Sequence, residues 1–498
     1  MANDILWTIS IIAQTDEQHD WEYSTLVDDI NNNRHEKLRY VIFRYDQDNR
    51  NITFWEANTK QELQPNEGIK PLPVDSMDQI KNVLAEFFAG EILSVPSDYH
   101  MLITWGHGAG LGFFHYDRSA GTKTRNNSLF GITDDKEKDD YKKNKRKINI
   151  KNVHHSILLS NLSTKFGSKN RDEFRKTNSF HPDNIKEFNF STDILLAEDF
   201  ADILEETFGN PNLTKNGTEK VNVFIANNCW MNMFEVGWAL REHVDVYAAP
   251  QTVVPFAGFN YHKLFKSLPT IDYSGTKAPT APWVIARNIT DNFLLKYTDT
   301  DIDEKYFKKT YGKYKNFGDQ FSQEKADSDV RQMAISVNHL ECYNEINNLI
   351  NELCRHLIRK LNTQDRYFLQ RIDTARSYCG DFTQEGVSFI DFTNFFCELI
   401  KGFQTNEADE LKELYRKFFF LKENAQLSIL NPGELFRFMP TDFYSQSPQM
   451  FSIFFPSRTA RSDTTKQFLD LYFDENNYSK FQKASEWDDF LKIYFNKK

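Results

Sequence analysis

Two short apolar runs, each followed by a reactive side chain, constrain the fold of this chain more than any other feature. Residues 221–231 read Val-Asn-Val-Phe-Ile-Ala-Asn-Asn-Cys-Trp-Met, and residues 99–110 read Tyr-His-Met-Leu-Ile-Thr-Trp-Gly-His-Gly-Ala-Gly. Each run alternates apolar and β-branched residues over the length of a strand and then breaks at small or polar residues, which predicts a buried strand. In parallel α/β sheets, reactive groups gather at the carboxyl ends of the strands. We therefore expect Cys229 and His107 to lie together.

A thiol beside an imidazole is the minimum equipment for nucleophilic acyl transfer, because histidine can take the thiol proton and later protonate a leaving amine. A single cysteine at a strand end is more often a small buried hydrophobic residue, and a single histidine is more often structural. Here Gly106, Gly108 and Gly110 surround the histidine, which permits close approach of the backbone to a ligand. The N–H groups of Gly108 and Cys229 are the expected oxyanion-hole donors.

The first half of the chain alternates strand-like and helix-like segments, which is typical of a mostly parallel sheet with helices on both faces. After about residue 278 helical patterns dominate. We expect a core over residues 1–275 and a mainly helical unit with a few strands over residues 276–498. The expected strands are 6–12, 38–45, 51–56, 100–104, 221–227, 244–249, 387–390 and 450–455, and the expected helices are 21–31, 75–88, 191–208, 233–242, 330–361 and 408–420.

A polar, lysine-rich stretch interrupts the core from about residue 118 to about residue 190. It contains Lys-Lys-Asn-Lys-Arg-Lys at residues 142–147 and few periodic apolar positions. This composition is typical of an exposed, flexible insertion. The alternatives that the sequence leaves open are a processing loop, a lid over the site, and a docking patch for an acidic partner.

Composition excludes several classes of function. The formal charge of −11 argues against binding nucleic acid or an anionic membrane with the whole surface. No apolar window is long enough to cross a bilayer, and the opening residues have no positively charged segment typical of a signal peptide. The five cysteines are odd in number and lack a CxxC pair, which favours reduced thiols in the cytoplasm over disulfides or a zinc site. We expect a cytoplasmic protein without nucleic-acid or membrane partners.

The residues around His107 and Cys229 resemble the motifs of clostripain-like (C11) cysteine peptidases, which belong to the caspase, legumain, gingipain and separase clan. Further counterparts lie along nearly the whole chain, at residues 7–11, 255–261, 374–376, 389–391, 451–456 and 487–491. The resemblance implies an α/β fold, a caspase-like three-layer sandwich with a mostly parallel central sheet and a C-terminal, mainly helical extension. It also implies cleavage of protein substrates, with His107 as general base and acid and Cys229 forming a thioester acyl-enzyme.

The chain departs from this family at the expected S1 pocket, which binds the substrate's P1 side chain. The residue two before the cysteine is usually an aspartate that pairs with arginine or lysine, but here it is Asn227. A second acid usually lies where this chain has Ala257. An unpaired buried cation would cost on the order of several kcal/mol. We therefore expect a neutral P1 residue, with Phe256 and Phe259 as an apolar wall and one hydrogen bond from Asn227.

Three questions follow from this departure. Glu242, Asp245 or another acid in the pocket would restore a preference for basic residues. Relatives often cut themselves after a basic residue in the insertion, but a neutral S1 pocket should prevent self-cleavage at residues 142–147, leaving a chain that is active intact or latent until a protein partner activates it. Asp134, Asp135, Asp139 and Asp140 lack EF-hand spacing, so we expect no metal or other cofactor. Calcium activates some relatives, so the resemblance alone leaves calcium activation open.

Three functions fit these residues. The first is a cytosolic endopeptidase under restraint, which would activate a toxin or a pore-forming protein by limited proteolysis. The second is a catalytically idle scaffold that binds a partner through the basic insertion. The third is a thiol-dependent acyl transferase. Covalent labelling of Cys229 by a peptidyl electrophile distinguishes an enzyme from a scaffold, because a structural thiol stays inert, and product formed with an added amine identifies a transferase.

Overall fold

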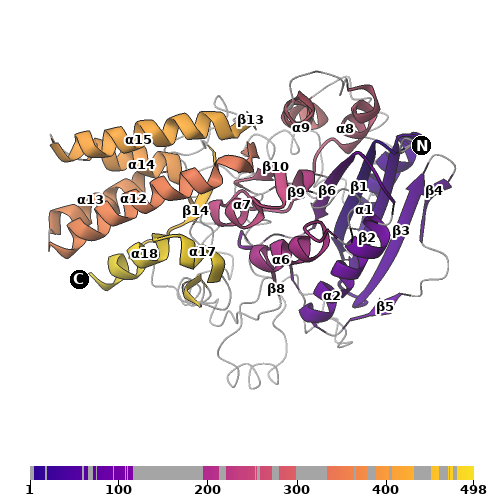
Figure 1. The fold of residues 1–498 in the computed structure, drawn as a ribbon, viewed down its shortest axis with the longest axis horizontal. Coiled ribbons are helices and arrows are strands. Elements are labelled where there is room, and N and C mark those ends of the chain that lie inside the picture. Colours follow the sequence, from indigo (N-terminus) through magenta and orange to yellow (C-terminus); the bar gives the residue numbers. More distant parts are fainter. Residues whose placement is uncertain are drawn as a thin grey trace, which may run out of the picture.

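A ten-stranded central sheet organises the molecule in the computed structural model (Figure 1). The structure describes residues 5–16, 20–58, 61–65, 71–74, 76–93, 95–106, 108, 110–115, 194–211, 213, 220–252, 254, 258–271, 280–298, 334–363, 366–379, 389–402, 406–430, 450–458, 469, 472–474 and 479–497. His107, Ala109 and the lysine-rich stretch therefore lie outside the described residues.

The sheet has a parallel centre and antiparallel edges. Its strands lie in the order β13 (Gln426–Leu430), β11 (Ile335–His339), β10 (Val244–Pro250), β9 (Val221–Asn227), β6 (Tyr99–Trp105), β1 (Trp7–Thr15), β2 (Leu38–Asp46), β3 (Asn51–Asn58) and β4 (Gln61–Pro65), and β5 (Leu72–Pro73) pairs with β3. Neighbours from β10 to β2 run parallel, and the remaining pairs run antiparallel. All residues of β1 are buried, as expected for a strand covered on both faces.

Helices cover both faces of this sheet. One layer contains α1 (Asp20–Asn32), α8 (Tyr261–Ser267) and α9 (Thr280–Thr298), and the other contains α2 (Met77–Phe87), α6 (Ala197–Thr207) and α7 (Phe234–Leu240). Within β2, Tyr40 packs on Phe265 of α8, whereas Phe43 packs on Phe87 of α2. Because Tyr40 and Phe43 are an odd number of positions apart, their side chains point to opposite faces. The expected three-layer α/β architecture is confirmed.

The C-terminal part is mainly helical, as expected. It contains α12 (Tyr343–Asn362), α13 (Arg366–Tyr378), α14 (Phe392–Lys401), α15 (Asn406–Ala425), α17 (Ser479–Ala484) and α18 (Trp487–Asn496), with β12 (Phe389–Asp391) antiparallel to β14 (Ser452–Phe454). Trp487 is fully buried among phenylalanine rings of this part. The boundary at residue 275 stays a prediction, but β11 and β13, which lie beyond it, extend the central sheet.

Two expected helices begin with strands instead. The helix predicted over 330–361 was wrong at its start, because β11 occupies Ile335–His339 and α12 begins only at Tyr343. Ile335 and Val337 are fully buried in this antiparallel partner of β10. Likewise, β8 (Ile194–Leu196) precedes α6 and pairs with β7 (Gly112–His115). The described residues also include short helical turns, which are η1 (Phe88–Ile92), η4 (Leu268–Thr270) and η5 (Leu340–Cys342).

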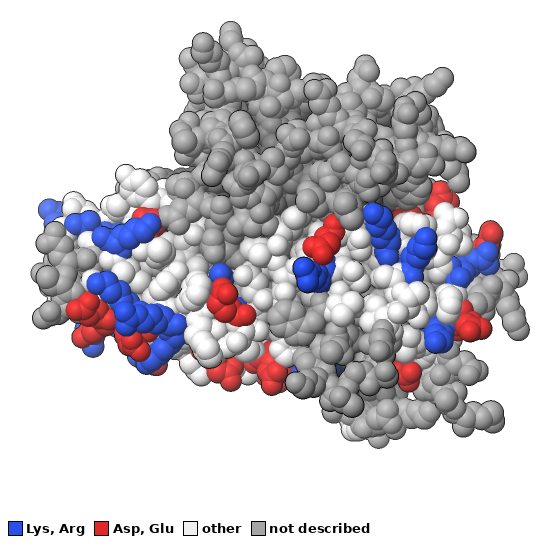
Figure 2. All heavy atoms as spheres, turned by 90° about the horizontal axis from the view of Figure 1, so that it is seen from above, with Lys and Arg blue, Asp and Glu red and all other residues white. Residues whose placement is uncertain are grey.

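The described surface carries charges of both signs. On the face seen in Figure 2, basic and acidic side chains lie beside one another over the part of the chain that is coloured. On α15, Lys412 pairs with Asp409, and Arg416 pairs with Glu413. Among the described helices, none is long and apolar enough to cross a membrane.

Candidate active site

The carboxyl ends of β6 and β9 meet at the centre of the sheet. The two strands are parallel neighbours, and their register places Trp105 opposite Asn227. Beyond this pair, the Gly106 N–H donates to the Asn227 carbonyl oxygen (3.3 Å). The Thr104 hydroxyl donates to Asn228 Oδ1 (2.5 Å). The expectation that the two strand ends lie side by side is therefore confirmed.

Gly108, the residue after His107 in the sequence, lies directly against the backbone of Cys229. A Cβ atom added to Gly108 would lie 2.4 Å from the carbonyl oxygen of Cys229 and 2.8 Å from its nitrogen. Only glycine allows this approach, because any larger side chain would overlap the Cys229 backbone. His107 itself lies outside the described residues, so its role stays a prediction.

The thiol of Cys229 is buried in this conformation. The side chain is 5% exposed, and its S–H donates to the Val254 carbonyl oxygen (3.7 Å) while its sulfur accepts from the Val254 N–H (3.5 Å). Burial raises the pKa of the Cys229 thiol to about 12, although the N–H groups of Val254 and Cys229 act in the opposite direction. A nucleophilic cysteine needs a lowered pKa. In this conformation burial therefore favours the protonated thiol over the thiolate.

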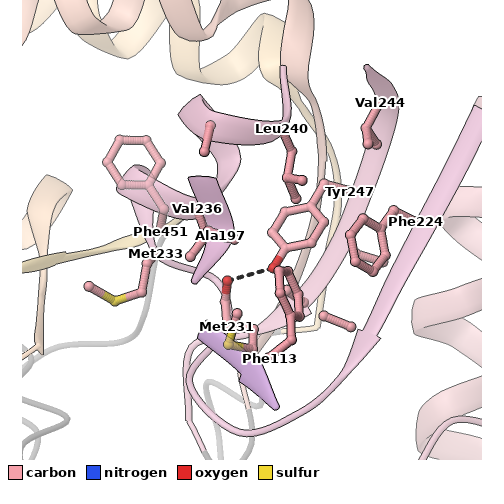
Figure 3. Packing of buried hydrophobic residues seen from close by; sticks show 14 of the residues in the cluster. Phe113, Ala197, Phe224, Met231, Met233, Val236, Leu240, Val244, Tyr247 and Phe451 are labelled. Carbon is pink, nitrogen blue, oxygen red and sulfur yellow. Dashed lines mark hydrogen bonds between the residues drawn. The ribbon is translucent and has the colours of Figure 1, made fainter. Parts of the chain in front are cut away.

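The turn that follows the cysteine is held in a strained conformation. Trp230 has a φ of 58°, in the left-handed region that is costly for a bulky side chain. Its N–H donates to the Thr252 carbonyl oxygen (2.9 Å), and the Tyr247 hydroxyl donates to the Met231 carbonyl oxygen (2.7 Å; Figure 3). These bonds tie the turn to β10 and to the residues after it, so that the position of Cys229 depends on both neighbouring segments.

The structure describes two of the four residues predicted for the S1 pocket. Asn227 is 1% exposed and packs on Gly258, where an added Cβ would lie 2.2 Å from Asn227 Oδ1. Phe259 is also 1% exposed, and its ring packs against Phe293 of α9. Phe256 and Ala257 lie outside the described residues. Asn227 therefore lies two residues before Cys229 in the sequence, and in space it contacts Gly258, which precedes Phe259.

The two acids considered as replacements in this pocket lie at the other end of the sheet. Asp245 accepts a hydrogen bond from Asn222 Nδ2 (3.3 Å), near the start of β9. Glu242 pairs with Arg241 (3.2 Å) and is exposed. Asn227, in contrast, ends β9. Neither Glu242 nor Asp245 therefore lies beside Asn227, and the alternative that another acid supplies the charge stays open.

Residues of the C-terminal part contact Asn232, which follows Cys229, and Gly110, which follows His107. The sequence did not assign them to the site. The Ser452 N–H donates to the Asn232 carbonyl oxygen (2.8 Å), and Asn232 Nδ2 donates to the Met450 carbonyl oxygen (2.6 Å). The ring of Phe389 covers Gly110, whose φ is 74° and whose added Cβ would lie 2.4 Å from the ring. The strand-like pattern at 450–455 predicted the strand but could not identify its distant partner.

No group of three or more metal-ligating side chains occurs among the described residues. The expected absence of a metal cofactor stays a prediction, because the acids at 134–140 lie outside them.

A family model matches about the C-terminal three-fifths of the chain. Residues 187–494 match the model of the clostripain family, Peptidase_C11, over a range that contains Cys229 and begins after His107. No curated protein sequence matches. Similar solved structures include a secreted C11 cysteine protease from Bacteroides thetaiotaomicron, "iotapain" (11% identity, 98% of this chain and 99% of that chain, TM-score 0.49), and an inactive zymogen C11 protease from Parabacteroides distasonis (12% identity, 99% of both chains, TM-score 0.47).

Proposed function

The chain belongs to the clostripain family of cysteine peptidases, and on that premise we propose that it is an endopeptidase with Cys229 and His107 as its catalytic dyad. The observation that carries the proposal is the contact between Gly108 and the Cys229 backbone at the ends of two parallel strands. This contact places Gly108, the residue after His107 in the sequence, against the cysteine that the strand pattern favours.

The reaction follows from the two side chains. His107 takes the Cys229 proton, and the thiolate attacks the carbonyl carbon of the scissile peptide bond. The resulting oxyanion is held by the N–H groups of Gly108 and Cys229. The carbon–nitrogen bond then breaks as His107 protonates the leaving amine, which leaves a thioester on Cys229. Water, deprotonated by His107, attacks the thioester, releases the new carboxylate and restores the thiol.

We further propose that catalysis requires Val254 to move away from the thiol. In this conformation the Val254 carbonyl oxygen accepts the S–H that His107 must remove. A substrate strand, or an activating protein partner, that takes over the backbone groups of Val254 would free the sulfur. This latency supports a peptidase that is restrained until it meets its substrate or partner.

The proposed P1 residue is neutral, either apolar or amide-bearing. Support comes from the uncharged Asn227 at the end of β9 and from the distant location of Glu242 and Asp245. For the same reason we propose that the chain does not cut itself at residues 142–147, and that Ala257, Phe256 and Phe259 complete a pocket without a carboxylate.

We propose a reducing, cytoplasmic setting without a metal cofactor. All five cysteines are free in the structure, which supports a compartment that keeps thiols reduced. A restrained peptidase in that setting is suited to limited proteolysis of one protein partner. We propose that its substrate is a toxin or a pore-forming protein, which the cleavage activates.

A peptidyl electrophile with a neutral P1 residue tests the dyad. We expect it to attach to Cys229 of the full-length chain, with or without calcium, and attachment should be lost in Cys229→Ala and slowed at least about 100-fold in His107→Ala. Cys397→Ala, which removes a cysteine of α14, should label like the parent. No labelling after addition of candidate partners and substrates would instead favour the idle scaffold.

A further inference from the structure

A carboxyl group is buried just beyond the cysteine turn. Glu235 lies in the first turn of α7 and is 0% exposed. Its Oε1 accepts hydrogen bonds from the Phe454 N–H (3.1 Å) and from the Tyr472 hydroxyl (3.1 Å). Its Oε2 is buried without a hydrogen-bond partner among the described residues. An apolar side chain would avoid the cost of burying this group, so the carboxyl calls for an explanation other than packing.

These bonds continue a line of contacts between the cysteine turn and β14. Asn232 is bonded to Met450 and to Ser452, and Met233 pairs with Ser452. Glu235 extends the line by one more step, to the Phe454 N–H. The Tyr472 ring lies 4.6 Å from the ring of Phe454 and so approaches the same carboxyl oxygen. Among the described residues that join the turn to β14, Glu235 is the one that carries a carboxyl group.

We propose that Glu235 is a positioning residue, which holds the turn bearing Cys229 against β14 while its carboxyl is neutral and loosens that contact when it ionises. The proposal depends on the proposed function only in taking Cys229 as the nucleophile.

The surroundings of the carboxyl support this role. Burial raises the pKa of Glu235 to about 7, and the N–H groups of Glu235 and Phe454 and the Tyr472 hydroxyl oppose that rise. The elements around α7 carry other ionisable groups, but these groups contact residues other than Glu235. Glu198 of α6 accepts from N–H groups of α17, and Lys480 of α17 pairs with Asp202 and Glu205. Tyr343 of α12 contacts Gly237, and His339 of β11 pairs with Glu341 of η5.

The direction of the pH effect follows from this raised pKa. The packed state binds the proton more tightly than a state in which Glu235 is in water, where its pKa has the ordinary value of 4.5. As the pH rises from 4.5 to about 7, the solvated, open state therefore gains stability relative to the packed state. Opening of the turn exposes Cys229, which is buried when the turn is packed.

The test is alkylation of Cys229 by iodoacetamide in the full-length chain, measured by mass spectrometry of the peptide that contains it. Glu235→Gln keeps an acceptor for Phe454 and Tyr472 but stays neutral. We expect Cys229 to react about 20-fold or more slowly in this variant than in the parent at about pH 8, and within about fivefold at about pH 5. Comparing the two proteins at each pH cancels the ionisation of the thiol itself.

Glu198→Gln is the matched control. Glu198 is also a buried carboxyl with a pKa raised chiefly by burial, and it also accepts two backbone N–H groups, but these belong to α17. We expect this variant to label like the parent at both pH values. Equal rates for Glu235→Gln and the parent at about pH 8, or the same change in Glu198→Gln, would overturn the proposal.

Tyr472→Phe gives a second test that needs no change at Glu235. The ring can remain on Phe454, but the hydroxyl that stabilises the ionised carboxyl is removed, so the pKa of Glu235 rises further. We expect the pH at which Cys229 labelling accelerates to move upward, and an unchanged midpoint would contradict the role of Glu235. Alkylation requires no turnover, so a chain without peptidase activity would still decide this proposal.

Discussion

At the scale of single residues, the buried environment of Cys229 disfavours the thiolate that the proposed mechanism needs. Burial favours the thiol over the thiolate, although the N–H groups of Val254 and Cys229 act in the opposite direction. The strained backbone at Trp230 persists because the neighbouring segments fix it, which is a common property of functional sites. The sequence predicted the motif around the cysteine. It could not predict the contact of Val254 with the thiol, because that contact depends on how the chain folds back after β10.

Gly108→Ala tests the contact between the two loops. The added methyl group would overlap the Cys229 carbonyl oxygen, at 2.4 Å from a backbone that cannot move freely. We expect a loss of peptidase activity of about 100-fold or more, since the proposed oxyanion-hole donors and the proposed nucleophile would shift together. Gly90→Ala is the matched control, because nothing lies within 4 Å of its added Cβ. Activity retained in Gly108→Ala would show that this contact does not position the site.

At the scale of elements, sequence patterns predicted the parallel centre of the sheet better than its edges. The central strands are rich in apolar and β-branched residues and are almost entirely buried, as expected for strands covered on both faces. In contrast, the helix predicted over 330–361 includes the residues of β11, because a short run such as Ile-Ser-Val-Asn-His fits either periodicity. Its identity as a strand depends on pairing with β10, and that pairing is a tertiary contact that no local pattern contains.

Asn232→Asp tests the attachment of the cysteine turn to β14. Asn232 is fully buried, and its Nδ2 donates to the Met450 carbonyl oxygen, so a carboxylate would place two acceptors in contact. We expect a loss of about 2–4 kcal/mol in the free energy of unfolding, measured by urea denaturation, together with lower activity. A loss below about 1 kcal/mol would contradict the importance of this bond.

The control for that substitution is Asn351→Asp. Asn351 Nδ2 also donates to a backbone carbonyl oxygen, that of Ala484, but the bond is exposed and Ala484 keeps a second donor in Asn347. We expect a change of less than about 1 kcal/mol, because water replaces the lost partner.

At the scale of the whole molecule, the C-terminal part contacts the candidate site. It supplies the edge strands β11 and β13, the Phe389 ring over the histidine loop, and the β14 backbone that holds the cysteine turn. Composition and periodicity predicted a mainly helical extension here, but its contacts with the site join residues more than 200 positions apart. The helices could therefore be predicted locally, whereas their functional contacts could not.

The pH dependence of stability follows from the buried carboxyl of this interface. Glu235 has a pKa raised from 4.5 to about 7 in the folded state, so its contribution to stability is lost as the pH rises through this window and does not return above it. Glu235→Gln should gain up to about 3 kcal/mol relative to the parent between pH 4.5 and about pH 7. His243, whose pKa is lowered by burial, acts oppositely but equally in both proteins. Urea denaturation of both proteins at several pH values checks this, and a constant difference would refute it.

The most direct measurement is hydrolysis of a fluorogenic peptide library varied at P1, using the full-length chain beside Cys229→Ala. The account predicts cleavage by the parent alone, with a neutral residue at P1, because Asn227 replaces the usual acid and Glu242 and Asp245 lie at the far end of the sheet. Cleavage after arginine or lysine would contradict the pocket, and equal cleavage by Cys229→Ala would contradict the nucleophile.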